Sequence, residues 1–110
     1  MKKKRMKEGF IYIISNKNIA DYFKIGVTID IEARLRVYQT SDPNREFTVE
    51  YYVFHPEVYE AEKKIRESLK HFAKNIKGEW YNTTLEFAKS RLDESLEAYN
   101  SGEWNERIIN

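Results

Sequence analysis

Residues 10–14 read FIYII and residues 22–28 read YFKIGVT, and these two apolar stretches decide the fold. Both are rich in β-branched and aromatic residues, which favour strands. The residues between them, 15–21, are mostly polar and typical of a loop. We therefore expect the two strands to form an antiparallel hairpin with a longish turn.

The pairing of this hairpin determines which side chains share a face of the sheet. If Ser15 faces Asp21, the antiparallel register places Tyr12 opposite Lys24. A tyrosine that acts as a base needs a pKa below its usual value of about 10. A cation opposite would favour the phenolate, and Lys24 is the candidate. The alternative is that Tyr12 is an ordinary core tyrosine and Lys24 an exposed strand residue.

The remaining elements follow as helix, strand, helix, short strand and helix. They are expected at residues 31–39, 47–54, 56–72 and 80–81, and between Thr83 and Gly102. Asp30 suits the cap of the first helix, and Pro56 suits the first turn of the second. Thr83 opens a capping box for the third helix, which Gly102 ends. This order indicates an α+β domain in which helices pack on a small antiparallel sheet.

Length and composition restrict the possible classes of protein. A chain of 110 residues is long enough for one modest core. It has no cysteine, so disulfides, zinc–thiolate sites and thiol catalysis are excluded. The apolar run at residues 10–14 is too short for a signal core or a membrane span. We expect a soluble, cytoplasmic protein.

Charge is unevenly distributed along the chain. Residues 1–7 carry five of the 19 basic residues and no acid, which leaves 14 basic against 18 acidic residues, or −4, in the remainder. A body of this charge is unsuited to wrapping long nucleic acids, so contact has to come from a local patch or from the tail. The alternative is that the tail is only a solvated end.

We accordingly divide the chain into three regions. Residues 1–8 are a basic flexible tail, residues 9–82 are the core, and residues 83–110 are a helix and tail packed on the same domain. The acidic residues of this last region suit packing or contact with a protein partner better than contact with DNA.

Glu62 is the most informative single position of the second helix. Helical projection at about 100° per residue places it near the rim of the apolar stripe that runs from Val58 to Phe72. A carboxylate at the edge of a core is costly without a partner, and a metal ion or a cation would serve. The alternative is a glutamate that bends outward or pairs with a nearby lysine.

Arg34 and Tyr38 are spaced i and i+4 on the first helix, so their side chains are neighbours. Arg34 either snorkels or presents its planar fork to a phosphate. Arg36 lies away from that face and is expected to be solvated. His55 and His71 have no partner at ligand spacing and do not indicate a zinc site.

These residues together resemble the GIY-YIG nuclease superfamily over residues 9–81, about two thirds of the chain. Residues 9–12 (GFIY) resemble its first signature. Residues 24–26 (KIG) resemble the second, with Lys24 where most members carry tyrosine. Residues 78–81 (GEWY) are similar to the ending of a divergent branch that is common in phage and bacterial genomes and tends to carry this lysine.

The same resemblance extends to single positions of the helices. Arg34 falls in the segment that supplies the family's arginine, and Tyr38 falls where members carry histidine or tyrosine. Glu62 aligns with the metal-binding glutamate. Arg66 departs from the pattern, because many members of the branch carry histidine four residues after the glutamate.

The resemblance implies a small three-stranded antiparallel sheet flanked by helices and a one-metal hydrolysis of DNA phosphodiester bonds. In that scheme Tyr12 takes a proton from the attacking water and Arg34 stabilises the phosphate. Glu62 holds a single Mg²⁺ or Mn²⁺, and Tyr38 and Lys24 assist. The implied nucleic-acid contacts are Lys24, Arg34, Arg36 and Arg66. Trp80 is expected to pack in the core.

Three interpretations remain open at this point. The first is a Mg²⁺-dependent DNA endonuclease. The second is a binding module for nucleic acid or protein that keeps the scaffold without the chemistry, favoured by Lys24, Arg66 and the acidic body. The third is an unrelated α+β interaction protein in which Tyr12, Arg34 and Glu62 do not converge.

Overall fold

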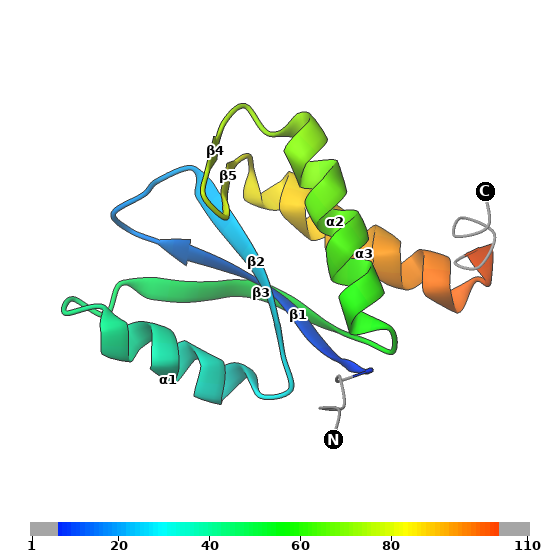
Figure 1. Cartoon of the computed structure of the whole chain (residues 1–110), viewed down its shortest axis with the longest axis horizontal. Helices are drawn as coiled ribbons and strands as arrows, with labels where there is room; N and C mark the ends of the chain where they lie inside the picture. Colours follow the sequence, from blue (N-terminus) through cyan, green and yellow to red (C-terminus); the bar gives the residue numbers. More distant parts are fainter. Residues whose placement is uncertain (1–6, 104–110) are drawn as a thin grey trace, which may run out of the picture.

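A computed structural model describes residues 7–103, which form one antiparallel sheet and three helices (Figure 1). In chain order the elements are β1 (Gly9–Asn16), β2 (Tyr22–Thr28), α1 (Ile31–Ser41), β3 (Phe47–His55), α2 (Val58–Phe72), β4 (Ile76–Lys77), β5 (Trp80–Asn82) and α3 (Leu85–Asn100). The α+β class is confirmed. The predicted basic tail falls mainly on residues 1–6, outside the described residues.

The sheet has five strands in the order β3-β1-β2-β5-β4, so the predicted number of three is wrong. The difference lies in the hairpin of β4 and β5 at one edge. A loop was predicted for residues 74–78, because a two-residue strand is too short to show an alternating pattern. Gly78 turns the chain between the two strands with a φ of +59°, a backbone conformation that favours glycine.

The predicted register of the β1–β2 hairpin is wrong by two residues. Tyr12 pairs with Gly26, and Lys24 pairs with Ile14. Asp21 adopts a φ of +68° just before β2, a loop shape that the sequence did not indicate. Side chains alternate with a period of two along a strand, so Tyr12 and Lys24 still share one face as diagonal neighbours.

The main core lies between the sheet and the pair α2 and α3. Figure 1 shows these two helices on one side of the sheet and α1 on the other. The core residues are Ile11, Ile13, Ile25, Val58, Ala61, Ile65, Leu69, Tyr81, Ala88 and Leu92. The predicted stripe of α2 is confirmed except at Phe72, which is 61% exposed. Phe72 is the last residue of the helix, where its ring packs edge-on against Phe87 of α3.

The helix ends follow the capping residues with small differences. α2 begins at Val58, so Pro56 lies in the preceding turn and not in the first helical turn as predicted. Thr84, and not Thr83, caps α3 by accepting a hydrogen bond from Phe87 N. Gly102 follows this helix with a φ of +84°. No helix within residues 7–103 is long and apolar enough to cross a membrane.

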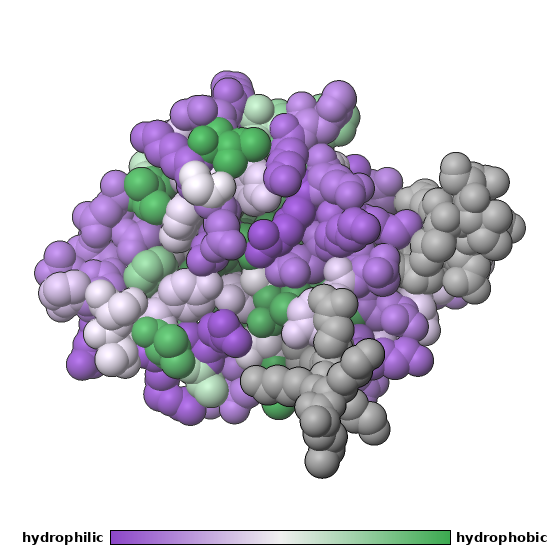
Figure 2. Space-filling model, in the orientation of Figure 1, coloured by the Kyte–Doolittle hydropathy of each residue, from purple (hydrophilic) through white to green (hydrophobic). Residues whose placement is uncertain are grey.

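α1 is attached to the opposite face of the sheet by few contacts. Asp30 caps it as predicted, with its side chain accepting a hydrogen bond of 3.0 Å from Ala33 N, and the helix continues to Ser41. None of its residues is fully buried. Figure 2 shows hydrophilic residues over the outer surface of α2 and a more mixed surface over α1.

Candidate active site

Tyr12 of the central strand β1 lies on the α1 face of the sheet, and its ring crosses Gly26 of β2. A Cβ atom built on Gly26 would fall 2.2 Å from Tyr12 Oη, so only glycine leaves room for the ring. Tyr12 is 2% exposed, and its hydroxyl lies 3.0 Å from that of Tyr38 on α1, a hydrogen-bonding distance. The glycine of the KIG motif therefore leaves the space in which the Tyr12 ring crosses β2.

The ring of Tyr12 points toward a part of β2 that has no further strand beside it. Among the described residues β5 pairs with β2 only from Tyr22 to Lys24. Beyond that point Arg66 of α2 reaches the edge and donates through Nη2 to the Ile25 carbonyl at 3.3 Å. α2 and α1 lie on opposite faces of the sheet, and Arg66 brings a side chain of α2 to this open edge.

Two of the sequence-predicted residues, Arg34 and Glu62, act electrostatically on a third, Tyr12. Burial raises the pKa of Tyr12 well above its usual value, and the contact with Tyr38 raises it further. The Arg34 guanidinium lowers this pKa, and the Glu62 carboxylate raises it. Tyr12 therefore lies within electrostatic range of both Arg34 and Glu62. The cation that favours the phenolate is Arg34 and not the predicted Lys24.

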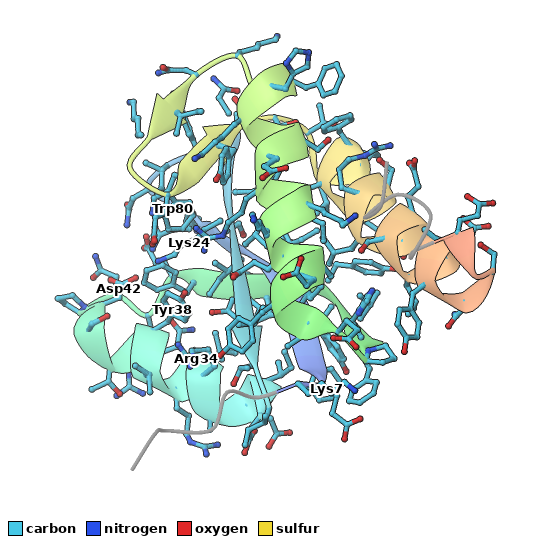
Figure 3. All side chains as sticks on the ribbon, turned by 45° about the vertical axis from the view of Figure 1, so that its right-hand side comes forward. Lys7, Lys24, Arg34, Tyr38, Asp42 and Trp80 are labelled. Atoms are coloured by element: carbon cyan, nitrogen blue, oxygen red, sulfur yellow. The ribbon has the colours of Figure 1, made fainter. Side chains whose placement is uncertain are left out.

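Lys24 is instead engaged by the hairpin of β4 and β5. Its Nζ lies 3.0 Å from Glu79 Oε2 and 5.5 Å from the centre of the Tyr38 ring. The hydrogen bond and charge of Lys24 hold the pKa of Glu79 below its usual range, and Arg66 adds to this effect. Figure 3 shows Trp80, Lys24, Tyr38 and Arg34 in succession from the hairpin of β4 and β5 to α1.

Aromatic rings form one side of the site. Tyr38 packs against Phe47 at 5.0 Å between ring centres, and Phe47 stacks on Trp80 at 6.3 Å. Trp80 is half-buried on this face, so its predicted place in the core is wrong. Neighbouring strand residues point to opposite faces, and it is Tyr81 that enters the core.

The two other predicted arginines lie in different places. Arg66 joins the site, with Nη2 at 3.2 Å from Glu62 Oε2. Arg36 is exposed and lines a depression with Leu35 and Arg45, apart from the residues around Tyr12. Sequence analysis missed Glu79, although its place in the GEWY motif was a signal that could have identified it.

Glu62 provides a limited site for a metal ion. Its side chain is 17% exposed, and no cluster of three or more histidine, cysteine or acidic residues able to hold a metal occurs within residues 7–103. A single carboxylate fits Mg²⁺ or Mn²⁺ only if the ion keeps most of its waters and takes other ligands from a phosphate. The donor set permits this arrangement, but Arg66 already contacts one of the two carboxylate oxygens.

Comparison with curated proteins and with solved structures finds no match. Among protein families, the one described as the T5orf172 domain matches residues 9–98. The matched range contains all five strands, α1, α2 and most of α3, and therefore every residue of the site described above. This chain belongs to the T5orf172 domain family, a phage-associated domain.

Proposed function

We propose that this protein is a metal-dependent endonuclease that hydrolyses DNA phosphodiester bonds at the open edge of β2, in the manner of GIY-YIG nucleases. The observation that carries the proposal is that Arg34 of α1 and Glu62 of α2 both act electrostatically on Tyr12 of β1. Membership of a phage-associated domain family supports a role connected with nucleic acids.

The cations of the site would bind and orient the phosphate. Arg34 is exposed on α1 and offers a planar guanidinium that can hold two phosphate oxygens. Its charge would stabilise the additional negative charge of the transition state. Lys24 is 23% exposed and would add a second positive charge on the same face of the sheet.

Tyr12 would enter the reaction as a neutral phenol, because burial raises its pKa. The phenol can orient the attacking water by a hydrogen bond. Only the phenolate could take the proton from water, and Arg34 favours that form whereas burial opposes it. Tyr38 shares a hydrogen bond with Tyr12 and would orient its hydroxyl.

Glu62 would hold the divalent ion, which acts as a Lewis acid on the phosphate when bound. The carboxylate lies at the edge of the α2 stripe beside the open part of β2, where a phosphate could complete the ligands of the ion.

The test is cleavage of supercoiled plasmid with Mg²⁺ or Mn²⁺. We expect Glu62→Ala to abolish nicking and Tyr12→Phe to reduce it by about 10²-fold or more, the usual contribution of a positioned proton-transfer group. Glu67→Ala is the matched control, because Glu67 is exposed on the same helix. Persistent inactivity of the wild type on varied DNA substrates with metal present would refute the proposal.

A second candidate is a nucleic-acid-binding module that has lost the chemistry. The observations that favour it are the ion pair between Arg66 and Glu62 and the deep burial of Tyr12. It would bind DNA without cutting it under any divalent ion, and Lys24→Tyr would not create cleavage. Scission by the wild type that depends on metal would eliminate it.

A further inference from the structure

Four charged side chains alternate in sign along the open edge of β2. Glu62 Oε2 lies 3.2 Å from Arg66 Nη2, and Arg66 Nη1 lies 3.9 Å from Glu79 Oε1. Glu79 Oε2 lies 3.0 Å from Lys24 Nζ. This row of four charged side chains connects α2, the turn between β4 and β5, and β2. Its two acidic side chains balance its two basic side chains.

Arg66 holds the position of a counter-ion to Glu62. The guanidinium is anchored by the Ile25 carbonyl and is 32% exposed. Its Nε is buried and has no hydrogen-bond partner within residues 7–103. A buried N–H group that lacks a partner costs free energy, so this position does not satisfy Arg66 completely.

We propose that Arg66 and Glu79 regulate the occupancy of Glu62 by a divalent cation. The Arg66 guanidinium is the cation that a metal ion has to displace from Glu62. Glu79 attracts the same guanidinium and so weakens its hold on Glu62. The inference rests on the proposed function, because it takes Glu62 as the metal ligand. The new element is a competition between the Arg66 guanidinium and a metal ion for the Glu62 carboxylate. Arg66 and Glu79 are the positioning residues that decide its outcome.

The same ion pairs affect the binding of a phosphate. Glu79 partly neutralises both Lys24 and Arg66, the two cations nearest to it. A DNA phosphate must therefore compete with the Glu79 carboxylate for these cations. Removing the charge of Arg66 or of Glu79 should thus move metal affinity and DNA affinity in opposite directions.

The experiment measures Mn²⁺ binding by calorimetry and by the relaxation of water protons, without any cleavage. We expect Arg66→Gln to raise Mn²⁺ affinity by about tenfold and Glu79→Gln to lower it by about threefold, as removal of one nearby charge of each sign requires. A short DNA duplex is titrated by fluorescence anisotropy in EDTA. Its affinity should fall in Arg66→Gln and rise in Glu79→Gln.

Glu94→Gln is the matched control, because it removes the same charge from an ion pair with Arg91 on α3. It should change neither affinity. Circular dichroism verifies the fold of each variant. Glu79 is 58% exposed, so Glu79→Gln decides the question if Arg66→Gln does not fold.

The outcomes separate this inference from the proposed nuclease activity. Opposite shifts in Mn²⁺ and DNA affinity support the inference even if no variant cuts DNA. An Arg66→Gln variant that folds but binds Mn²⁺ no more tightly than the wild type overturns it, even if the wild type is an active nuclease. A Glu79→Gln variant that leaves both affinities unchanged, or the absence of Mn²⁺ binding in all variants, also overturns it.

Discussion

Gly26 shapes the site because it has no side chain. A Cβ atom added to Gly26 would lie within 3.0 Å of three atoms of Tyr12, its hydroxyl oxygen, Cζ and Cε1. Glycine in the interior of a strand usually weakens it, since the unfolded chain has more conformational freedom. At this position the absent Cβ leaves room for the Tyr12 ring to cross β2. Glu62 and Arg34 act electrostatically on the phenol there.

Gly26→Ala should therefore lower the free energy of unfolding by about 1–3 kcal/mol, the usual cost of overpacking. Chemical denaturation measures this change. Tyr12→Leu removes the three crowding atoms, so in that background Gly26→Ala should cost much less. An alanine variant as stable as the wild type would show that the ring does not cross Gly26.

At the scale of elements, α1 and α3 differ in how they are held. α3 buries Ala88, Leu92 and Ala98, whereas α1 buries no residue completely. Both helices have a side-chain cap at the N-terminus, from Asp30 and Thr84. Most helical stability in proteins comes from packing, so α1 should depend more on its cap than α3 does.

Asp30→Ala should lower the protection of α1 amides by about 1 kcal/mol, the typical contribution of an N-cap. Hydrogen exchange measures this loss, which should be confined to α1. In Thr84→Ala the burial of α3 should keep its central amides protected. Equal loss of protection in the central turns of both helices would contradict this account of α1.

A buried histidine ends β3, just before α2 begins. His55 is 0% exposed, and its Nδ1 accepts a hydrogen bond of 2.9 Å from Glu57 N, the N-cap residue of the helix. A protonated imidazole has no lone pair for this bond. Burial lowers the pKa of His55 below the ordinary value of 6.5.

This shift makes stability depend on pH. Below about pH 6.5 the unfolded state binds a proton that the folded state does not, so the free energy of unfolding should fall as pH falls, by at most about 1.4 kcal/mol per pH unit. Thermal melts between pH 7.5 and 5.5 measure the effect. In His55→Asn the free energy of unfolding should no longer fall with pH in this range. The control His71→Asn, at an exposed position, should show the same pH dependence as the wild type.

At the scale of the whole molecule, positive charge is concentrated at the N-terminal end of the sequence. Residues 8–110 have a formal charge of −4 (14 basic and 18 acidic residues), and residues 1–7 contribute five positive charges. Two of the cations of the site, Lys24 and Arg66, are already paired with acids. Under the proposed function, general attraction to DNA has to come from the N-terminal segment.

Lys3→Gln together with Lys4→Gln should therefore weaken DNA binding. The logarithm of the binding constant falls linearly with the logarithm of the salt concentration, and each lost phosphate contact reduces the size of this slope by about 0.9. Lys63→Gln together with Lys70→Gln is the control, because it removes two exposed charges of α2. Equal effects of the two pairs, measured by anisotropy over a range of salt, would contradict a specific role of the N-terminal segment.

Local patterns were sufficient to predict a large part of the fold. Periods of two and of about 3.6 residues identified the first three strands and the three helices, and capping chemistry identified Asp30. These signals are local, because each depends on residues within a few positions along the chain. The short strand expected at residues 80–81 is confirmed as β5, whereas β4 was expected to be loop because it pairs over only two residues.

The sequence by itself determined the α+β class, the apolar stripe of α2 and the residue types available for chemistry. Only the tertiary structure decided that Tyr12 pairs with Gly26, that Arg66 contacts Glu62, and that Glu79 engages Lys24. The physical reason is that a loop conformation sets the register of the hairpin, and the place where β5 ends determines which part of β2 stays open. The loop shape depends on a positive φ at Asp21, which is not a glycine, and the open part of β2 depends on β5, a segment distant in the chain. No local pattern encodes either property.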